Sequence, residues 1–215
     1  MRSPFHLLLL TFALLLAPQC DKTDDEDTQR PDAQTIVDLY GSGSCGEEEY
    51  TPSELSEYVL PYPVGTGYVV NLAHCGGSYH SAGQPDQYAI DFDMGIGTTI
   101  TAAREGQVIF VEESGQDGGF PNNLVVVSHS DGTYGQYMHL TQNGALVEIG
   151  DRVEKGDPIG LSGNTGLAGY PHLHFVVTKR GSFRYPYEST PATFSNTLAH
   201  QGSLTPGIQY PALEY

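Results

Sequence analysis

The sequence predicts an all-β fold built from short antiparallel strands. Glycine (26 residues), proline (14) and tyrosine (14) are abundant among the 215 residues, whereas charged residues make up only 16%. This composition is typical of short strands joined by many tight turns and does not fit a helical bundle. With 39% hydrophobic residues, the chain can bury one sizeable core. We therefore expect one folded domain with irregular N- and C-terminal extensions.

Short apolar runs recur between turn signals from about residue 62 onward. They are rich in the β-branched and aromatic residues that favour strands. The expected strands span residues 68–70, 87–92, 106–111, 124–128, 133–140 and 172–178. Asp131 and Gly132, between two of these runs, indicate a hairpin turn. A short helix is expected over residues 51–58, with Thr51 or Ser53 as its N-cap.

The N-terminus has the pattern of an export signal followed by a tether. Arg2 precedes an apolar run over residues 7–16, which is too short to span a bilayer and matches the apolar region of a signal peptide. Residues 20–38 are rich in charge and lack apolar periodicity. We expect a signal peptide over residues 1–19 and an acidic tether over residues 20–38.

The three cysteines indicate one unpaired residue and one disulfide, because an exported chain favours paired thiols. Cys20 follows the apolar run directly, which resembles the lipidated cysteine of bacterial lipoproteins. Lipidation of Cys20 and plain secretion both stay open, and acyl chains on Cys20 would be the membrane anchor. Cys45 and Cys75 remain for a disulfide. A nucleophilic or metal-binding role is the alternative for these two, but no C-x-x-C spacing supports it.

The charge of the chain excludes one class of partner. Nine basic residues stand against 26 acidic ones, which gives a formal net charge of −17. Such a charge repels nucleic acids and anionic membrane surfaces. We therefore expect no nucleic-acid partner, and no membrane contact other than a lipid anchor.

Two histidines and an aspartate lie where a metal site could form. Alternation along a strand places His172 and His174 on one face, with the apolar residues between them on the other. Asp91 lies inside an apolar strand, where an unpaired carboxylate is costly, so it needs donors or a metal. Two imidazole nitrogens and one carboxylate oxygen are a typical ligand set of catalytic Zn²⁺.

His139 is a further candidate, on the strand expected over residues 133–140. Alternation places it on the same face as Gly135 and Tyr137. A half-buried histidine bound to a backbone carbonyl is the structural alternative for an isolated position of this kind. His80 lies upstream, after a glycine-containing segment.

A series of motifs in a fixed order resembles one enzyme family. The motifs occupy residues 97–108, 129–133, 137–140, 150–156, 160–166 and 171–175. Together they resemble the lysostaphin-type (LytM-like) zinc metallopeptidases, which cut peptidoglycan cross-bridges and stem peptides. The resemblance implies an antiparallel, open barrel-like core with the duplicated hybrid motif over residues 60–180. An N-terminal extension over residues 39–59 and a C-terminal wrap over residues 181–215 would flank it.

The resemblance also implies a role for each of the five polar residues. His80, Asp91 and His174 match the ligands of one Zn²⁺ per chain. His139 and His172 match the catalytic pair beside the metal. The implied reaction is hydrolysis of peptide bonds in peptidoglycan by a metal-activated water, assisted by the two histidines. Either histidine could be the general base, with the other stabilising the oxyanion.

The spacing of the first two ligands departs from the commonest family pattern. Many members have H-x-x-x-D, which would place a histidine at the position of Gln87. His80 lies eleven residues before Asp91, and so resembles a subgroup with a longer insertion. His74 is the alternative first ligand.

Two other function classes remain as alternatives to an enzyme of the bacterial cell envelope. One is a catalytically silent member of the same fold that binds and activates another cell-wall hydrolase. Such a protein would not need the metal ligands, which this chain retains. The other is a lipoyl-type carrier barrel, because residues 147–160 resemble its β-hammerhead, but no hairpin with a modifiable lysine is present.

Overall fold

The computed structural model describes residues 45, 49–181 and 183–215. Cys20, the expected signal peptide and the expected tether lie outside these residues. Twelve strands and two short 3-10 turns make up the regular structure that is described. All strand pairs are antiparallel, so the predicted fold class is confirmed. Among the described residues, no helix is long and apolar enough to cross a bilayer.

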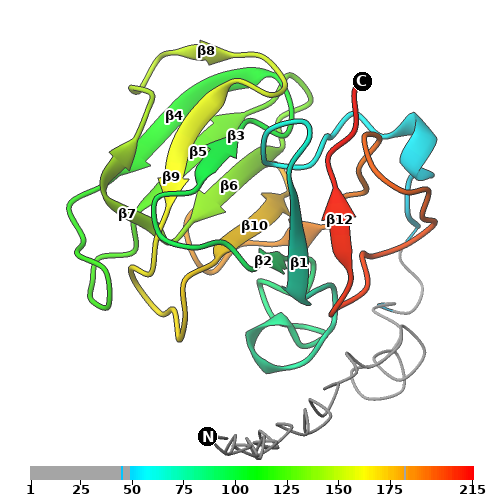
Figure 1. Cartoon of the computed structure of the whole chain (residues 1–215), viewed down its shortest axis with the longest axis horizontal. Helices are drawn as coiled ribbons and strands as arrows, with labels where there is room; N and C mark the ends of the chain where they lie inside the picture. Colours follow the sequence, from blue (N-terminus) through cyan, green and yellow to red (C-terminus); the bar gives the residue numbers. More distant parts are fainter. Residues whose placement is uncertain (1–44, 46–48, 182) are drawn as a thin grey trace, which may run out of the picture. The chain divides into compact units, whose positions relative to one another are not determined.

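Nine strands form the larger sheet, in the order β12-β1-β2-β10-β6-β5-β4-β8, with β11 pairing with β10 (Figure 1). The strands are β1 (Gly67–Leu72), β2 (Ile90–Phe92), β4 (Gly106–Glu112), β5 (Leu124–Ser128), β6 (Tyr134–Met138), β8 (Arg152–Val153), β10 (Leu173–Thr178), β11 (Ser189–Thr190) and β12 (Gln209–Pro211). The order places β10, which carries two of the candidate histidines, in the middle of the sheet. Both edges of β10 are therefore paired, which fixes the backbone of this strand.

Three further strands form a smaller sheet in the order β3-β9-β7. They are β3 (Thr99–Thr101), β9 (Pro158–Ser162) and β7 (Leu140–Ala145). One hydrophobic core joins the two sheets. It contains Ile100 and Ile159 from the smaller sheet together with Val125, Tyr137 and Phe175 from the larger one, all at most 1% exposed.

Two sequence-based boundaries need correction. The helix expected over residues 51–58 is a single 3-10 turn, Ser53–Leu55, and Pro52 at its N-cap makes no side-chain cap. The segment instead bonds to C-terminal residues, for example from Ser53 N–H to the His200 carbonyl at 3.4 Å. The strand expected from residue 87 begins at Ile90, because the residues before it form hydrogen-bonded turns.

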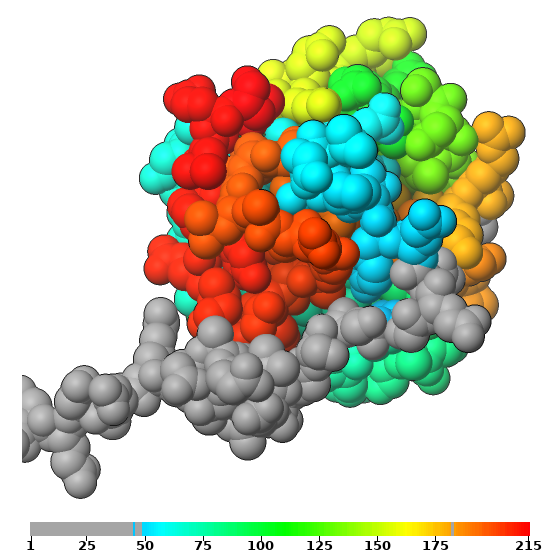
Figure 2. Space-filling model, turned by 90° about the vertical axis from the view of Figure 1, so that its right-hand side faces the viewer, coloured from blue at the N-terminus to red at the C-terminus, as the bar shows by residue number. Residues whose placement is uncertain are grey.

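Residues 49–60 and the C-terminal segment pack against each other on one face of the domain (Figure 2). Thr193 Oγ1 donates to the Thr51 carbonyl at 2.8 Å, and Asn196 Oδ1 accepts from Leu60 N–H at 2.7 Å. Strand β12 then pairs with β1. The residues after 181 therefore contribute to the main sheet as well as covering it.

Cys45 and Cys75 form a disulfide. Next to it, Cys75 N–H donates to the Gln87 carbonyl at 2.7 Å, which ties the segment before His80 to the segment before β2. The bridge closes a loop with a sequence separation of 30. Cys75 is thus joined to Cys45 through the disulfide, and its bond to Gln87 links the start of the longer His80–Asp91 spacing to its end.

Candidate metal centre

His174 and Asp91 face each other across two neighbouring strands. The register between β10 and β2 pairs His174 directly with Asp91, and the distance from His174 Nδ1 to Asp91 Oδ1 is 2.9 Å. Leu173 and Phe175, on either side of His174, lie in the core. The alternation predicted for this strand is thus present, and it directs His174 away from the core.

His80 reaches the same point from outside the sheet. It ends the 3-10 turn Ser78–His80, and the chain enters this turn through Gly77 and Ser78, which both have positive φ (89° and 51°). This reversal buries His80 to 1% exposure. Its Nε2 atom lies 3.5 Å from Asp91 Oδ1 and 3.4 Å from His174 Nδ1.

The three ligand atoms fit the geometry of a bound metal ion. Ligands of a tetrahedral zinc, at bond lengths of about 2.0–2.2 Å, lie about 3.3 Å apart. The three distances among His80 Nε2, Asp91 Oδ1 and His174 Nδ1 are 2.9, 3.4 and 3.5 Å. Burial would raise the pKa of Asp91, but hydrogen bonds from His174 and His80 hold it well below its usual range. Asp91 therefore supplies a carboxylate, and the group could hold a divalent cation.

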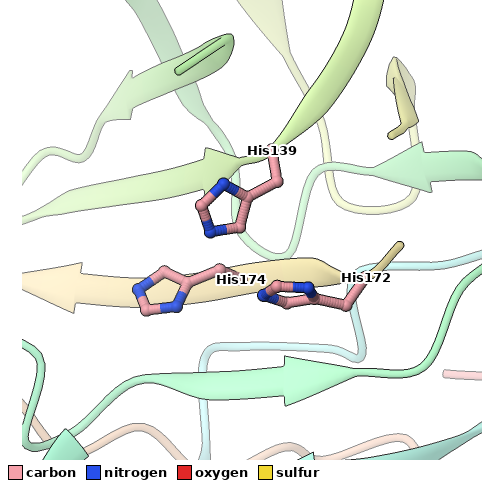
Figure 3. Close-up of side chains that lie close together, drawn as sticks. All are labelled: His139, His172 and His174. Atoms are coloured by element: carbon pink, nitrogen blue, oxygen red, sulfur yellow. The ribbon is translucent and has the colours of Figure 1, made fainter. Parts of the chain in front are cut away.

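His139 reaches the site by a route that differs from the sequence-based expectation. Strand β6 ends at Met138, and His139 has a positive φ of 67°. Alternation would have placed His139 on the face of Tyr137, whose ring lies in the core. The left-handed backbone reverses this direction, and His139 instead lies beside His172 and His174 (Figure 3). Such strained positions are found at functional sites more often than elsewhere.

Backbone carbonyls fix the tautomers of His139 and His172. His139 Nδ1 lies 2.7 Å from the Thr165 carbonyl, and His172 Nδ1 lies 2.8 Å from the Tyr170 carbonyl. A carbonyl only accepts, so each Nδ1 carries the hydrogen and each Nε2 is left as an acceptor when the ring is neutral. Burial, together with neighbouring histidine charges, lowers the pKa of His139 to about 3, and burial also lowers the pKa of His172. Both rings are therefore neutral near pH 7.

His139, His172 and His174 form a second group that could hold a metal ion. Their ring centroids are 4.7 Å (His139 to His172) and 5.6 Å (His139 to His174) apart. This group lacks a carboxylate to offset the charge of a cation. The group that contains Asp91 also has the ligand distances expected for zinc, so we favour it as the metal site.

Two residues that sequence reasoning did not select also contact the site. Asp86 Oδ1 lies 3.3 Å from His174 Nε2, and the Tyr187 hydroxyl donates to the same oxygen. Asp86 precedes β2 in a turn, and Tyr187 lies in the segment for which the sequence indicated no chemistry. One general rule pointed to such residues: a metal-bound imidazole usually donates a hydrogen bond from its second ring nitrogen.

The site opens into a cleft of about 650 Å³. Its rim has large side chains that are more than half exposed, namely Tyr79, Phe120, Leu167 and Tyr185. Tyr170 also lines the cleft, whereas Tyr137 lies in the core. Among the described residues, neither lysine nor arginine lines the cleft, whose titratable groups are carboxylates, histidines and tyrosines. An extended, uncharged chain segment with apolar contacts would suit these walls.

His74, the alternative first ligand, lies in neither of the two groups that could hold a metal. It is fully buried, and its Nδ1 atom lies 3.1 Å from the Tyr50 hydroxyl. Its ring stacks on Tyr50 and meets Tyr88 edge-on. Burial, and then the charges of His80 and His200, lower the pKa of His74 to about 3.

This buried histidine should make the protein sensitive to acid. The unfolded chain takes up a proton at His74 near pH 6.5, whereas the folded chain does so only near pH 3. The stabilising contribution is therefore complete above about pH 6.5 and is lost as the pH falls toward 3, by at most about 1.4 kcal/mol per pH unit. Denaturant unfolding of metal-free protein across this range should show a shallower pH dependence for His74→Gln. If the stability of the wild type and of His74→Gln falls equally steeply with pH, His74 is not the source of the acid sensitivity.

The sequence pattern of peptidase family M23 matches residues 85–186. An uncharacterized metalloprotease of Buchnera aphidicola is 43% identical over 88 residues, 41% of this chain and 22% of that protein. Lysostaphin of Staphylococcus simulans is 34% identical over 126 residues, 58% of this chain and 23% of lysostaphin. The peptidoglycan DD-endopeptidase ShyA of Vibrio cholerae is 38% identical over 91 residues, 42% of this chain and 20% of ShyA. The chain thus spans about a quarter or less of the length of these relatives.

Two solved structures can be compared with the present one. The catalytic domain of the antimicrobial peptidase lysostaphin from Staphylococcus simulans has a TM-score of 0.41 at 27% identity, covering 73% of this chain and 92% of that chain. The M23 metalloprotease pseudoalterin, from the deep sea, has a TM-score of 0.49 at 21% identity, covering 66% of this chain and 80% of that chain.

Proposed function

Since residues 85–186 form a domain of peptidase family M23, homologous to lysostaphin and ShyA, we propose that the protein is a zinc-dependent endopeptidase of peptidoglycan. The convergence of His80 Nε2, Asp91 Oδ1 and His174 Nδ1 supports the proposal most strongly. Two neutral imidazoles lie beside this point, in a cleft large enough for a peptide. These are the groups that hydrolysis of an amide requires.

His80, Asp91 and His174 would hold one Zn²⁺ per chain. A zinc ion at these ligands would polarise a peptide carbonyl and lower the pKa of water toward 7. Asp91 is the one charged ligand, so a zinc ion and its three ligands would together carry a net positive charge, which suits an electrophilic role. The cross-strand pairing of His174 with Asp91 sets their separation before any metal binds.

His139 and His172 would handle the protons of the reaction. Each presents an unprotonated Nε2 at neutral pH, because its Nδ1–H is bound to a carbonyl. One ring can accept the proton of the attacking water and pass it to the leaving amine. A ring that has taken up a proton can also donate a hydrogen bond to the developing oxyanion. The closeness of the two rings, 4.7 Å between centroids, lets them share these tasks.

The proposed substrate is a peptide bond in a stem peptide or cross-bridge of peptidoglycan. Support comes from the relatives, since ShyA is a peptidoglycan DD-endopeptidase and ALE-1 of Staphylococcus capitis is a glycyl-glycine endopeptidase. The exposed aromatic rim of the cleft suits an extended peptide. Such a substrate implies export to the cell envelope. The peptidase domain over residues 60–180, removal of residues 1–19 and lipidation of Cys20 belong to the same proposal.

Digestion of purified peptidoglycan tests the proposed activity. The purified chain should release new amino termini, lose this activity after treatment with a chelator, and regain it when zinc is added back. Hydrolysis that continues in metal-free protein would rule out the mechanism. A zinc-loaded chain that cleaves no peptidoglycan would instead favour the alternative, a silent activator of another cell-wall hydrolase.

A further inference from the structure

We propose that Asp86 and Tyr187 are positioning residues for the metal ligand His174, an inference that rests on the proposed zinc site. Neither residue belongs to a group of side chains that could hold the ion directly. Their contribution would be to fix the ring of His174 and so raise the metal affinity of the site. Tyr187 would thereby give the C-terminal segment a part in the chemistry of the cleft.

The contact between Asp86 and His174 orients the imidazole ring relative to the metal site. Asp86 Oδ1 lies 3.3 Å from His174 Nε2, and the two side chains are only 16% and 8% exposed. A carboxylate without a proton only accepts hydrogen bonds, so Nε2 carries a hydrogen and donates it to Asp86. Nδ1 faces Asp91 Oδ1 and His80 Nε2, and a metal ion bound there would replace the hydrogen that Nδ1 donates to Asp91. Asp86 thus keeps the hydrogen on Nε2 and holds the ring with Nδ1 directed at the metal site.

Tyr187 holds Asp86 in place from the other side. Its hydroxyl donates to Asp86 Oδ1, the same oxygen that contacts His174. The position of Tyr187 is set by β11, which begins two residues later and pairs with β10 through Ser189 and Thr178. The chain of contacts therefore starts and ends on β10, the strand that carries His174. Such a closed arrangement limits the freedom of the carboxylate.

The other metal-binding histidine has no comparable support. Among the described residues, His80 Nδ1 is buried without a hydrogen-bond partner. The orientation of His80 therefore depends on packing and on its 3-10 turn. Of the two imidazole ligands, His174 is the one that an outer carboxylate fixes, so metal affinity should respond strongly to the loss of Asp86.

Zinc affinity, measured by competition with a chromogenic chelator, tests this inference without relying on activity. Asp86→Asn should weaken zinc binding by about 10- to 100-fold, the usual effect of losing an outer-shell partner. Tyr187→Phe removes one oxygen atom and should cause a loss near the lower end of that range. Tyr185→Phe is the matched control, because Tyr185 lines the same cleft and is 66% exposed. It should bind zinc as the wild type does.

A double variant separates a positioning role from general damage. Once Asp86→Asn is present, Tyr187→Phe should cause little additional loss, since the tyrosine acts through the carboxylate. Thermal unfolding of the metal-free variants identifies any that fail to fold. If Tyr187→Phe and Asp86→Asn fold normally and bind zinc within about twofold of the wild type, the inference is wrong. A wild-type chain that binds no zinc would instead refute the proposed function itself.

Discussion

Replacing His174 with alanine is expected to release the metal and abolish hydrolysis. His174 Nδ1 lies 2.9 Å from Asp91 Oδ1 and 3.4 Å from His80 Nε2. Its loss leaves two ligands on separate segments and also leaves Asp86 without its imidazole partner. The affinity for zinc should therefore fall by more than the roughly 10- to 100-fold expected for an outer-shell residue. Peptidoglycan cleavage should fall to background.

His74→Gln provides the control for this experiment. His74 is a buried histidine that the sequence offered as an alternative ligand. It bonds to Tyr50 and lies outside both groups that could hold a metal. The control should retain zinc and activity at neutral pH. Zinc should be measured by elemental analysis after gel filtration, together with cleavage. Hydrolysis that survives in a zinc-free His174→Ala protein would contradict the mechanism, and zinc loss in His74→Gln would contradict the ligand assignment.

Replacing His139 with alanine should abolish turnover but, unlike His174→Ala, leave zinc bound. His139 lies outside the group that contains Asp91, and its Nδ1 is bound to the Thr165 carbonyl. Loss of a general acid–base group typically lowers kcat by about 10²- to 10⁴-fold. Alanine tolerates a positive φ no better than histidine does, so the substitution relieves no backbone strain at this position.

Parallel measurements of kcat and zinc content check this prediction. His172→Ala should behave in the same way if the two rings share the proton transfers. If His139→Ala loses zinc as readily as His174→Ala, the metal is held by the alternative group of three histidines. The same result would remove His139 from its proposed role as a proton acceptor.

The sequence predicts six of the nine strands of the larger sheet from their short apolar runs, namely β1, β2, β4, β5, β6 and β10. The run around His174 places Leu173 and Phe175 in the core, as expected from a period of two. The three strands of the smaller sheet, and β8, β11 and β12 of the larger one, were not predicted. Residues 99–101 are too few to show a period, and β9 contains a proline and a glycine. Long-range pairing therefore determines these strands more than local preference does.

The site itself combines predictable and unpredictable parts. Alternation alone relates His172 to His174, and a carboxylate at Asp91 within an apolar strand requires a partner. The direction of His139 depends on one left-handed residue, which strand alternation does not anticipate. The contact of Tyr187 with Asp86 joins positions 101 residues apart. Such a contact arises from the pairing of β11 with β10 and has no local signature in the sequence.

The proposed function depends on a zinc site formed by His80, Asp91 and His174 in the folded chain. Native mass spectrometry of the purified, full-length chain, before and after removal of metal by a chelator, tests it most directly. We expect one zinc ion per chain in the untreated protein, lost with the chelator and regained when zinc is added. A folded chain that binds no zinc in either preparation would contradict it.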